Sequence, residues 1–323
     1  MDLDRMLEKC RRLQWDADDD LDWTVEPKAL SRDDEMAIVQ YFTDMSAIER
    51  LAGQLFQVQR DLVDDPTLQS IFETFVVDEE RHAVVAKRLA EHYDVHHYRD
   101  YQVNRHLQRF APAFRKVLRH VSPEVANAYI TSGEILLDIA LLRSLNDFVG
   151  DAMSDQAMRL INRDESRHIA IDYFMVEYYA SAKYEAWEKA QPEKSALQKA
   201  RALLTFAIFT WRAGPFLRDV FFRPMDMTDP SGKRLLEAFH RIQLIGLKEE
   251  VQHRPFNRFL RVMQDGFNHP IVGRIAGPAI SRIVGLEPRV LEKLYTDADE
   301  LDIQKKSFAE MARETLAMKG AAA

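Results

Sequence analysis

The pentapeptide DEERH at residues 78–82 returns as DESRH at residues 164–168. Each copy contains a Glu-x-x-His motif. Because residues three apart lie on the same face of an α-helix, the carboxylate and the imidazole of one motif can reach a common ion. A single Glu-x-x-His on a surface helix is usually a solvated pair, so the repetition of the motif is what indicates a site.

A glutamate stands at a similar distance before each motif. Glu49 lies 30 residues before Glu79, and Glu134 lies 31 residues before Glu165. The offsets between the two halves are 85, 86 and 86 residues for the pairs Glu49 and Glu134, Glu79 and Glu165, and His82 and His168. This regularity predicts two similar helix pairs that face each other across a pseudo-twofold axis.

The sequence around these residues is helical in period. Apolar residues recur at three- and four-residue spacing, strand-like alternation is scarce, and the chain has only 11 glycines and 12 prolines. Ser31 with Asp34 resembles a capping box, and prolines suit two further helix starts. We therefore predict an all-α protein with core helices at 32–62, 66–94, 122–148 and 154–180. The longer connection 95–121 includes a short helical stretch of its own.

The repeated residues occupy interior positions of the four predicted helices. Ionised carboxylates are almost never buried alone, because removing the charge from water costs several kcal/mol. Two divalent ions would cancel four glutamates, while two neutral imidazoles add nitrogen ligands without charge. The predicted metal ligands are Glu49, Glu79, His82, Glu134, Glu165 and His168. A register shift could replace Glu49 or Glu134 by a neighbour such as Asp138.

The residues beside the motifs suggest an outer layer of contacts. Asp78 and Asp164 are well placed to accept the second imidazole N–H of a ligating histidine, across the bundle, which would fix its tautomer. Arg81 and Arg167 could pair with these carboxylates. The remaining histidines show no repeat relation, and we interpret them as surface or structural residues.

Composition limits the other classes of protein. The net charge of −8 disfavours nucleic acid as a general partner. Ala202–Trp211, a strongly apolar run, is shorter than the roughly 20 residues that span a bilayer, so no membrane span is expected. Cys10 is the single cysteine and the first residues lack a signal-peptide pattern, so we expect a cytoplasmic protein.

At these residues the chain resembles the ferritin-like non-haem diiron carboxylate oxygenases, and most of all the 4-aminobenzoate N-oxygenase group. The likeness covers about residues 32–180 and rests on IER at 48–50, VVDEERH at 76–82, GEILLDIALL at 133–142 and NRDESRH at 162–168. It implies a ferritin-like four-helix bundle with one long crossover, two iron ions held by the six predicted ligands, and O2-dependent oxidoreductase activity. Manganese with iron would suit the same ligands.

One position departs from the N-oxygenase pattern. That group has a further histidine one turn before the last Glu-x-x-His, where this chain has Ile161. We therefore predict four glutamates and two histidines as protein ligands, with Ile161 packed beside the centre. C–H hydroxylation and acyl desaturation remain open beside N-oxygenation. A ribonucleotide reductase would need a tyrosine where Ala86 stands, and a rubrerythrin would need more cysteines.

The resemblance also implies partners. The substrate would be a small molecule, free or bound to a carrier protein, and electrons would come from a ferredoxin or a reductase. Asp138, one turn beyond Glu134, is the candidate catalytic residue, although a structural role is equally open. A ferroxidase or peroxidase that handles iron, and a partner-binding protein with structural metals, are the alternatives from other classes.

The rest of the chain is expected to extend the same domain. We expect one domain over 1–323, with the core bundle at about 32–180 and a helical extension at about 181–323 that shapes a substrate chamber. Residues 232–293 carry 11 Lys and Arg against 6 Asp and Glu, a local charge of +5. This basic region could dock an acidic carrier or a coenzyme A thioester, or it could be a solvated face. We expect a homodimer.

Overall fold

The computed structural model describes residues 1–284 and 286–320 and is built from helices, with no strand among those residues. The prediction of an all-α protein is confirmed. The helices are α1 (Leu3–Arg12), α2 (Arg32–Leu62), α3 (Pro66–Tyr93), α4 (Arg105–Val117), α5 (Pro123–Ile135), η1 (Leu136–Leu142), α6 (Arg143–Val149), α7 (Ala152–Ala180), α8 (Ala182–Ala190), α9 (Ala196–Phe216), η2 (Leu217–Phe222), α10 (Arg223–Thr228), α11 (Lys233–Leu247), α12 (Glu249–Gln252), α13 (Pro255–Asn268), α14 (Val272–Val284), α15 (Pro288–Leu291), α16 (Asp297–Lys305) and α17 (Phe308–Gly320).

The long helices begin where capping chemistry predicts. Ser31 accepts a hydrogen bond from the backbone N–H of Asp34 and starts α2. Asp65 accepts from the N–H groups of the first turn of α3, and Ser122 caps α5 in the same way. These caps satisfy N–H groups that have no partner inside the helix. The predicted bounds of the first, second and fourth core helices differ from the observed ones by no more than two residues.

The third core helix is interrupted. The predicted helix 122–148 consists of α5, the π-helical segment η1 and α6. A π-helical turn holds an extra residue, so the side chains that follow it lie on a different face from those of an uninterrupted α-helix. Asp138 lies inside η1, where the expected spacing of one α-helical turn after Glu134 does not apply.

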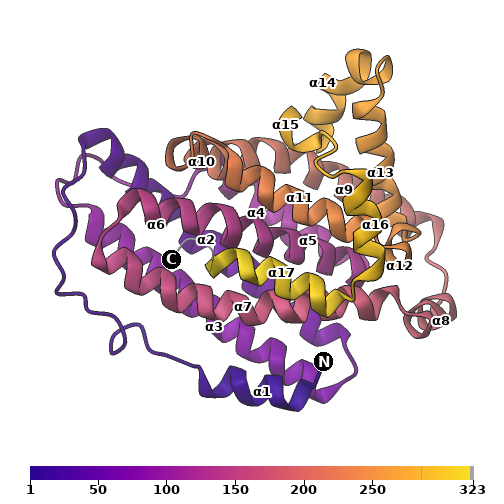
Figure 1. Cartoon of the computed structure of the whole chain (residues 1–323), viewed down its shortest axis with the longest axis horizontal. Coiled ribbons are helices and arrows are strands. Elements are labelled where there is room, and N and C mark those ends of the chain that lie inside the picture. Colours follow the sequence, from indigo (N-terminus) through magenta and orange to yellow (C-terminus); the bar gives the residue numbers. More distant parts are fainter. Residues whose placement is uncertain (285, 321–323) are drawn as a thin grey trace.

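Four helical segments enclose the centre of the molecule. α2 packs against α3 and α5, while α7 packs against α3 and α5. The long connection between α3 and α5 includes α4, which packs on α9. Around this centre, α1 lies across α3 and α7 on one side, and α17 and α11 cover α7 and η1 on the other (Figure 1).

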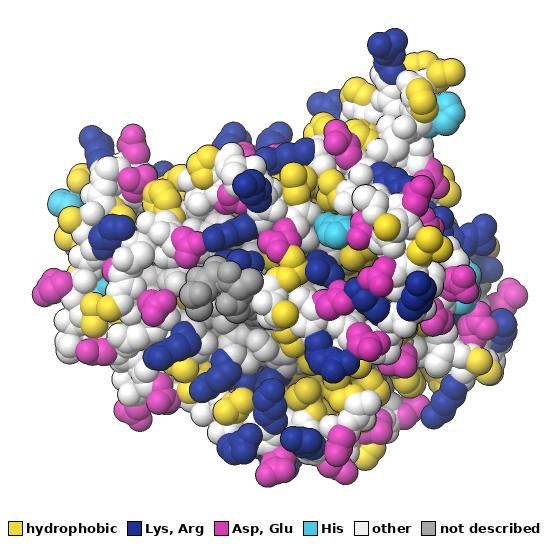
Figure 2. All heavy atoms as spheres, in the orientation of Figure 1, with side chains coloured by type: hydrophobic (Ala, Val, Ile, Leu, Met, Phe, Trp, Pro, Cys, Tyr) yellow, Lys and Arg dark blue, Asp and Glu magenta, His cyan; other side chains and the backbone are white. Residues whose placement is uncertain are grey.

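The C-terminal part adds a projection. α13 and α14 pack against each other as a hairpin that stands out at the upper right of the molecule in Figure 1, and α14 also contacts α9. In Figure 2 this projection shows hydrophobic and basic side chains together, whereas acidic and basic side chains alternate over the rest of the face. Ile271 and Ile275 are 66% and 77% exposed.

One helical stretch, Pro123–Val149, is long and apolar enough to cross a membrane by length and composition. Most of its apolar window, 72%, is buried inside the protein. Burial of this kind is what the central helix of a packed core requires.

Candidate metal centre

All six residues that the repeat singled out lie together in the interior. Each is at most 3% exposed. They come from α2, α3, α5 and α7, and each occupies the interior stripe of its helix between apolar residues such as Met45 and Phe56. The helical period therefore directs the carboxylates and imidazoles inward along with the apolar core.

The six residues form two overlapping groups. Potential ligand atoms within each group lie within 4.8 Å of one another. The first group is Glu49, Glu79, His82 and Glu165, and the second is Glu79, Glu134, Glu165 and His168. Glu79 and Glu165 belong to both. Two groups that share two carboxylates have the composition of a dinuclear site with two bridging carboxylates and one histidine for each ion.

The same nitrogen of each histidine faces the shared carboxylates. The Nδ1 atom of His82 lies 3.1 Å from an oxygen of Glu165. The Nδ1 atom of His168 lies 3.0 Å from Glu165 and 3.2 Å from Glu79. The rings of Phe75 and Phe56 pack against His168, with centroids 4.2 and 5.0 Å away, which restricts its rotation.

Asp78 and Asp164 contact the Nε2 atoms of the histidines, and each aspartate contacts the histidine of the other motif. Nε2 of His82 lies 3.1 Å from Asp164, and Nε2 of His168 lies 3.4 Å from Asp78. An ionised carboxylate can only accept, so these contacts keep a proton on Nε2, and Nδ1 would be the nitrogen that binds a metal ion. The predicted exchange of aspartates between the two halves is confirmed.

Arg81 and Arg167 neutralise the two aspartates. Arg167 is fully buried and donates to Asp78 at 2.9 Å and to Asp164 at 2.8 Å. Arg81 donates to the same two carboxylates. Two guanidinium groups cancel two aspartates, so this outer layer is balanced by itself. The four inner glutamates are left to be balanced by other cations.

The N-terminal segment completes the outer layer. The indole N–H of Trp15 donates to Asp164 at 2.6 Å, and Gln14 donates to Asp78 at 3.0 Å. The guanidinium of Arg81 lies over the Trp15 ring, 4.9 Å from its centroid. The sequence did not predict these two residues, because they stand outside the repeat and no spacing connects them to it.

The pKa values show the strain of packing four carboxylates together. Burial raises the pKa of Glu49 and of Glu134 well above the usual range, and neighbouring carboxylates add to the effect. Burial opposes the charged form of His82 and His168, yet the surrounding carboxylates raise the pKa of both well above 6.5. Protons thus balance part of the cluster charge when no other cation does.

The groups fit divalent metal ions. Both carboxylate oxygens of Glu49 are buried and receive no well-formed hydrogen bond from the described residues. A buried oxygen without a donor is costly, and a metal ion would remove that cost. Carboxylate and imidazole ligands suit iron, manganese and zinc alike, so the donor set does not choose among them.

Three other interior residues lie on α7 or on the segment that follows α5. Asp138 is fully buried in η1 but belongs to neither group. Ile161 is 1% exposed on α7, one turn before Glu165. Asp172, one turn beyond His168, is fully buried, and burial raises its pKa well above the usual range. Asp172 could not be predicted from the repeat, because the corresponding position after the first motif is Ala86.

Comparisons with protein-family models, with curated protein sequences and with solved structures gave no match to this chain.

Proposed function

We propose that this chain is a ferritin-like dinuclear non-haem iron oxidoreductase that uses O2 to oxidise a small organic substrate. The observation that carries the proposal is the pair of buried groups that share Glu79 and Glu165 and include one histidine each. The chain order supports it, because a single long connection between the second and third core helices is typical of ferritin-like bundles.

Each protein group has a distinct part in this proposal. Glu49 with His82 would hold one ion and Glu134 with His168 the other, while Glu79 and Glu165, which belong to both groups, would be available to either ion. Bound iron would supply the reactivity toward O2. The aspartates hold the imidazole rings in one tautomer, and the apolar core excludes water from the site.

The overall reaction requires an electron donor. Insertion of one oxygen atom into a C–H or N–H bond consumes one O2, two electrons and two protons, and it releases one water. No group described here can supply those electrons repeatedly, so a ferredoxin or a flavin-dependent reductase is the expected partner. Asp138, buried in the π-helical segment that follows α5, is the candidate to hold a proton during this reaction.

Metal content, oxygen uptake and product analysis test the proposal together. We expect two iron ions per chain, rapid O2 uptake by the reduced protein, and an oxygenated or dehydrogenated product from candidate amines and acyl thioesters. Oxygen uptake matched only by iron oxidation would favour a ferroxidase. A redox-silent zinc site would favour a structural role and would contradict the oxidoreductase.

The projecting hairpin is the proposed docking surface for an acidic carrier protein. Arg258, Arg274 and Arg282 are exposed there and make no ion pair with the described residues. Substitution of both Arg258 and Arg261 by glutamate should weaken binding of an acidic acyl carrier protein in a salt-dependent way. The same change at the exposed Arg115 of α4 is the control, and equal affinity in all variants would remove this role.

A further inference from the structure

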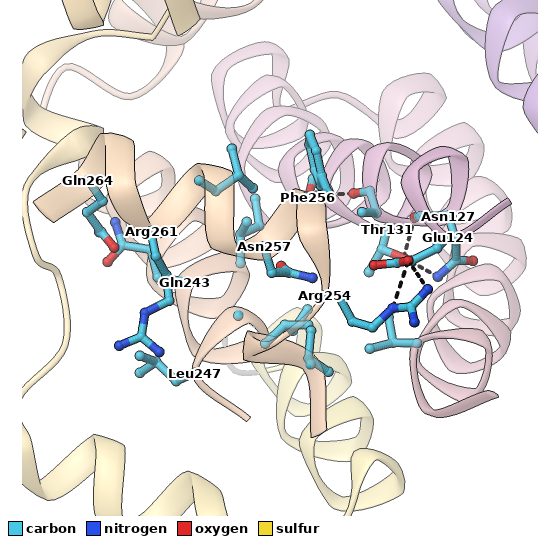
Figure 3. A pocket seen from close by; sticks show the side chains of 18 of the residues that line it. Glu124, Asn127, Thr131, Gln243, Leu247, Arg254, Phe256, Asn257, Arg261 and Gln264 are labelled. Carbon is cyan, nitrogen blue, oxygen red and sulfur yellow. Dashed lines mark hydrogen bonds and ion pairs between the residues drawn. The ribbon is translucent and has the colours of Figure 1, made fainter. Parts of the chain in front are cut away.

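A cavity of about 170 Å³ lies between α5, α7, α11 and α13. Its lining is mostly apolar, with Phe239, Ile242 and Leu247 of α11 opposite Ala128 and Val176 of the core helices. In Figure 3 the polar residues gather at two ends. Asn127, Thr131, Glu124 and Arg254 lie at one end, and Gln243, Arg261 and Gln264 lie at the other.

The first end of the cavity adjoins the candidate metal centre along α5. Asn127, Thr131 and Glu134 stand at positions i, i+4 and i+7 and therefore share one face of the helix. Asn127 and Thr131 line the cavity, whereas Glu134 belongs to the second metal-ligand group. Thr131 is three residues from Glu134, which is about 4.5 Å along the helix axis.

The same relation holds on α7. His168, Asp172 and Val176 are spaced by four residues each and share a face, and Val176 lines the cavity. The two faces are joined by a hydrogen bond, in which the side-chain amide of Asn127 donates to the backbone carbonyl of Asp172 at 3.3 Å. Two helices thus lead from the candidate ligands to one end of the cavity.

Asn127 presents an acceptor to this end. The Asp172 carbonyl can only accept, so the amide nitrogen of Asn127 faces it and the amide oxygen points elsewhere. Asn127 is 1% exposed, and its Oδ1 atom receives no hydrogen bond from any described residue. A buried acceptor of this kind calls for a donor from a bound molecule.

The charges at the same end cancel within the protein. Arg254 is 3% exposed and donates to Glu124 through two nitrogens, and it also pairs with Glu188. Arg261, at the other end, is partly exposed, so water can solvate its charge. A charged molecule at the first end would have to give up its hydration without a free counterion, which is costly.

The volume sets the size of the molecule. An apolar cavity of about 150 Å³ in another protein holds one benzene molecule. A cavity of about 170 Å³ therefore accepts a molecule of about the same size with one small substituent.

We propose that this cavity binds the organic substrate, and that the substrate is a small, uncharged, largely apolar molecule whose hydroxyl or N–H group donates to Asn127 Oδ1, on the face of α5 that leads to Glu134. The proposal rests on the function proposed above for the metal centre. It adds the substrate class and the residues that select it.

Binding of isomeric probes to the full chain tests this inference without any turnover. Benzyl alcohol and anisole have the same atoms, but only the alcohol can donate a hydrogen bond. One hydrogen bond corresponds to about a five- to tenfold difference in affinity, so calorimetry should show benzyl alcohol binding tighter by that factor. Benzoate and benzylammonium should bind more weakly than benzyl alcohol, because both are charged.

Variants locate the binding. Asn127→Leu should abolish the preference for benzyl alcohol over anisole. If Asn127→Leu does not fold, Thr131→Val takes its place and should reduce the same preference. Gly246→Leu should weaken both probes at least tenfold, since a side chain at Gly246 would point toward Asn257 and fill the cavity. An amide-to-leucine change at the exposed Gln57 of α2 is the matched control.

Two measurements distinguish a failure of this inference from a failure of the function on which it rests. In cobalt-loaded protein, benzyl alcohol should shift the visible cobalt spectrum, because the cavity ends one turn from Glu134. Binding without a shift would overturn the substrate assignment, and tighter binding of a charged probe would overturn the substrate class. A failure to bind cobalt would count against the metal centre alone, since probe binding is measured on the metal-free chain as well.

Discussion

Removal of metal should lower the stability of this protein by a predictable amount. The outer aspartates and arginines cancel, which leaves four inner glutamates at most 3% exposed. Two divalent ions would balance them. A ligand at one hundred times its dissociation constant stabilises the native state by about 2.7 kcal/mol, so two sites contribute about 5 kcal/mol.

This free energy can be converted into a melting temperature. The entropy of unfolding is about 2.1 cal/mol/K per residue, which for a chain of 323 residues makes 5 kcal/mol equal to about 7 °C. We expect chelation to lower the melting temperature by that order in a calorimetric scan. Identical transitions for the chelated and the metal-loaded protein would refute a buried dinuclear centre.

Single substitutions should separate the shared from the unshared ligands. Glu79 belongs to both groups, so Glu79→Gln should weaken both ions, whereas Glu49→Gln and Glu134→Gln should each affect one. Metal analysis after gel filtration measures the number of ions retained. Glu80→Gln, at the exposed neighbour of Glu79, is the control and should retain both. Full occupancy in Glu79→Gln would remove that residue from the ligand set.

Three further changes test the surroundings of the site. Trp15→Phe removes the hydrogen bond to Asp164 and should cost about 1.5–3 kcal/mol of unfolding free energy, measured in urea, whereas the exposed Trp211→Phe should cost little. Burial raises the pKa of Asp44 from 3.8 to about 6, against its hydrogen bonds from Asn104 and Gln40. Protonated Asp44 therefore favours the folded state below pH 3.8, and this contribution is lost as the pH rises through 6. Between these two pH values the unfolding free energy of Asp44→Asn should rise by up to about 3 kcal/mol relative to that of the unmodified protein. Ile161→His should add a nitrogen ligand and shift the ferric charge-transfer spectrum; an unchanged spectrum at full iron occupancy would show that position 161 does not reach the metal.

The core helices could be predicted because their ends are encoded locally. Ser31 and Asp65 cap backbone N–H groups within a few residues of themselves, and that chemistry is visible in the sequence. The π-helical segment η1 could not be predicted. Its residues, LLDIALL, suit an α-helix equally well, and its neighbours α11 and α7 are distant in the sequence, so no local pattern indicates the extra residue per turn.

The inner residues of the site could be predicted because the motif occurs twice. The outer aspartates and arginines lie inside the same pentapeptides, so the repeat allowed their role to be predicted as well. Trp15 is different. It contacts Asp164, which is 149 residues away, and nothing in the N-terminal segment repeats or alternates in a way that points to the site. Asp172 was missed for the related reason that the first motif has no equivalent carboxylate.

The basic region shows why a local charge excess is a weak guide to a surface. Arg254 lies in that region, yet it is buried against Glu124 of α5 and Glu188 of α8, which are far away in the sequence. Arg289 pairs with Asp226 of α10. The count of charges along the chain records neither burial nor partners. The exposed positive charge of this region is therefore smaller than the sequence suggested, and part of it lies on the α13–α14 hairpin. An acidic carrier should accordingly respond to charge reversal at the exposed Arg274, whereas loss of Arg254 should act mainly through stability, because it leaves Glu124 buried without its partner.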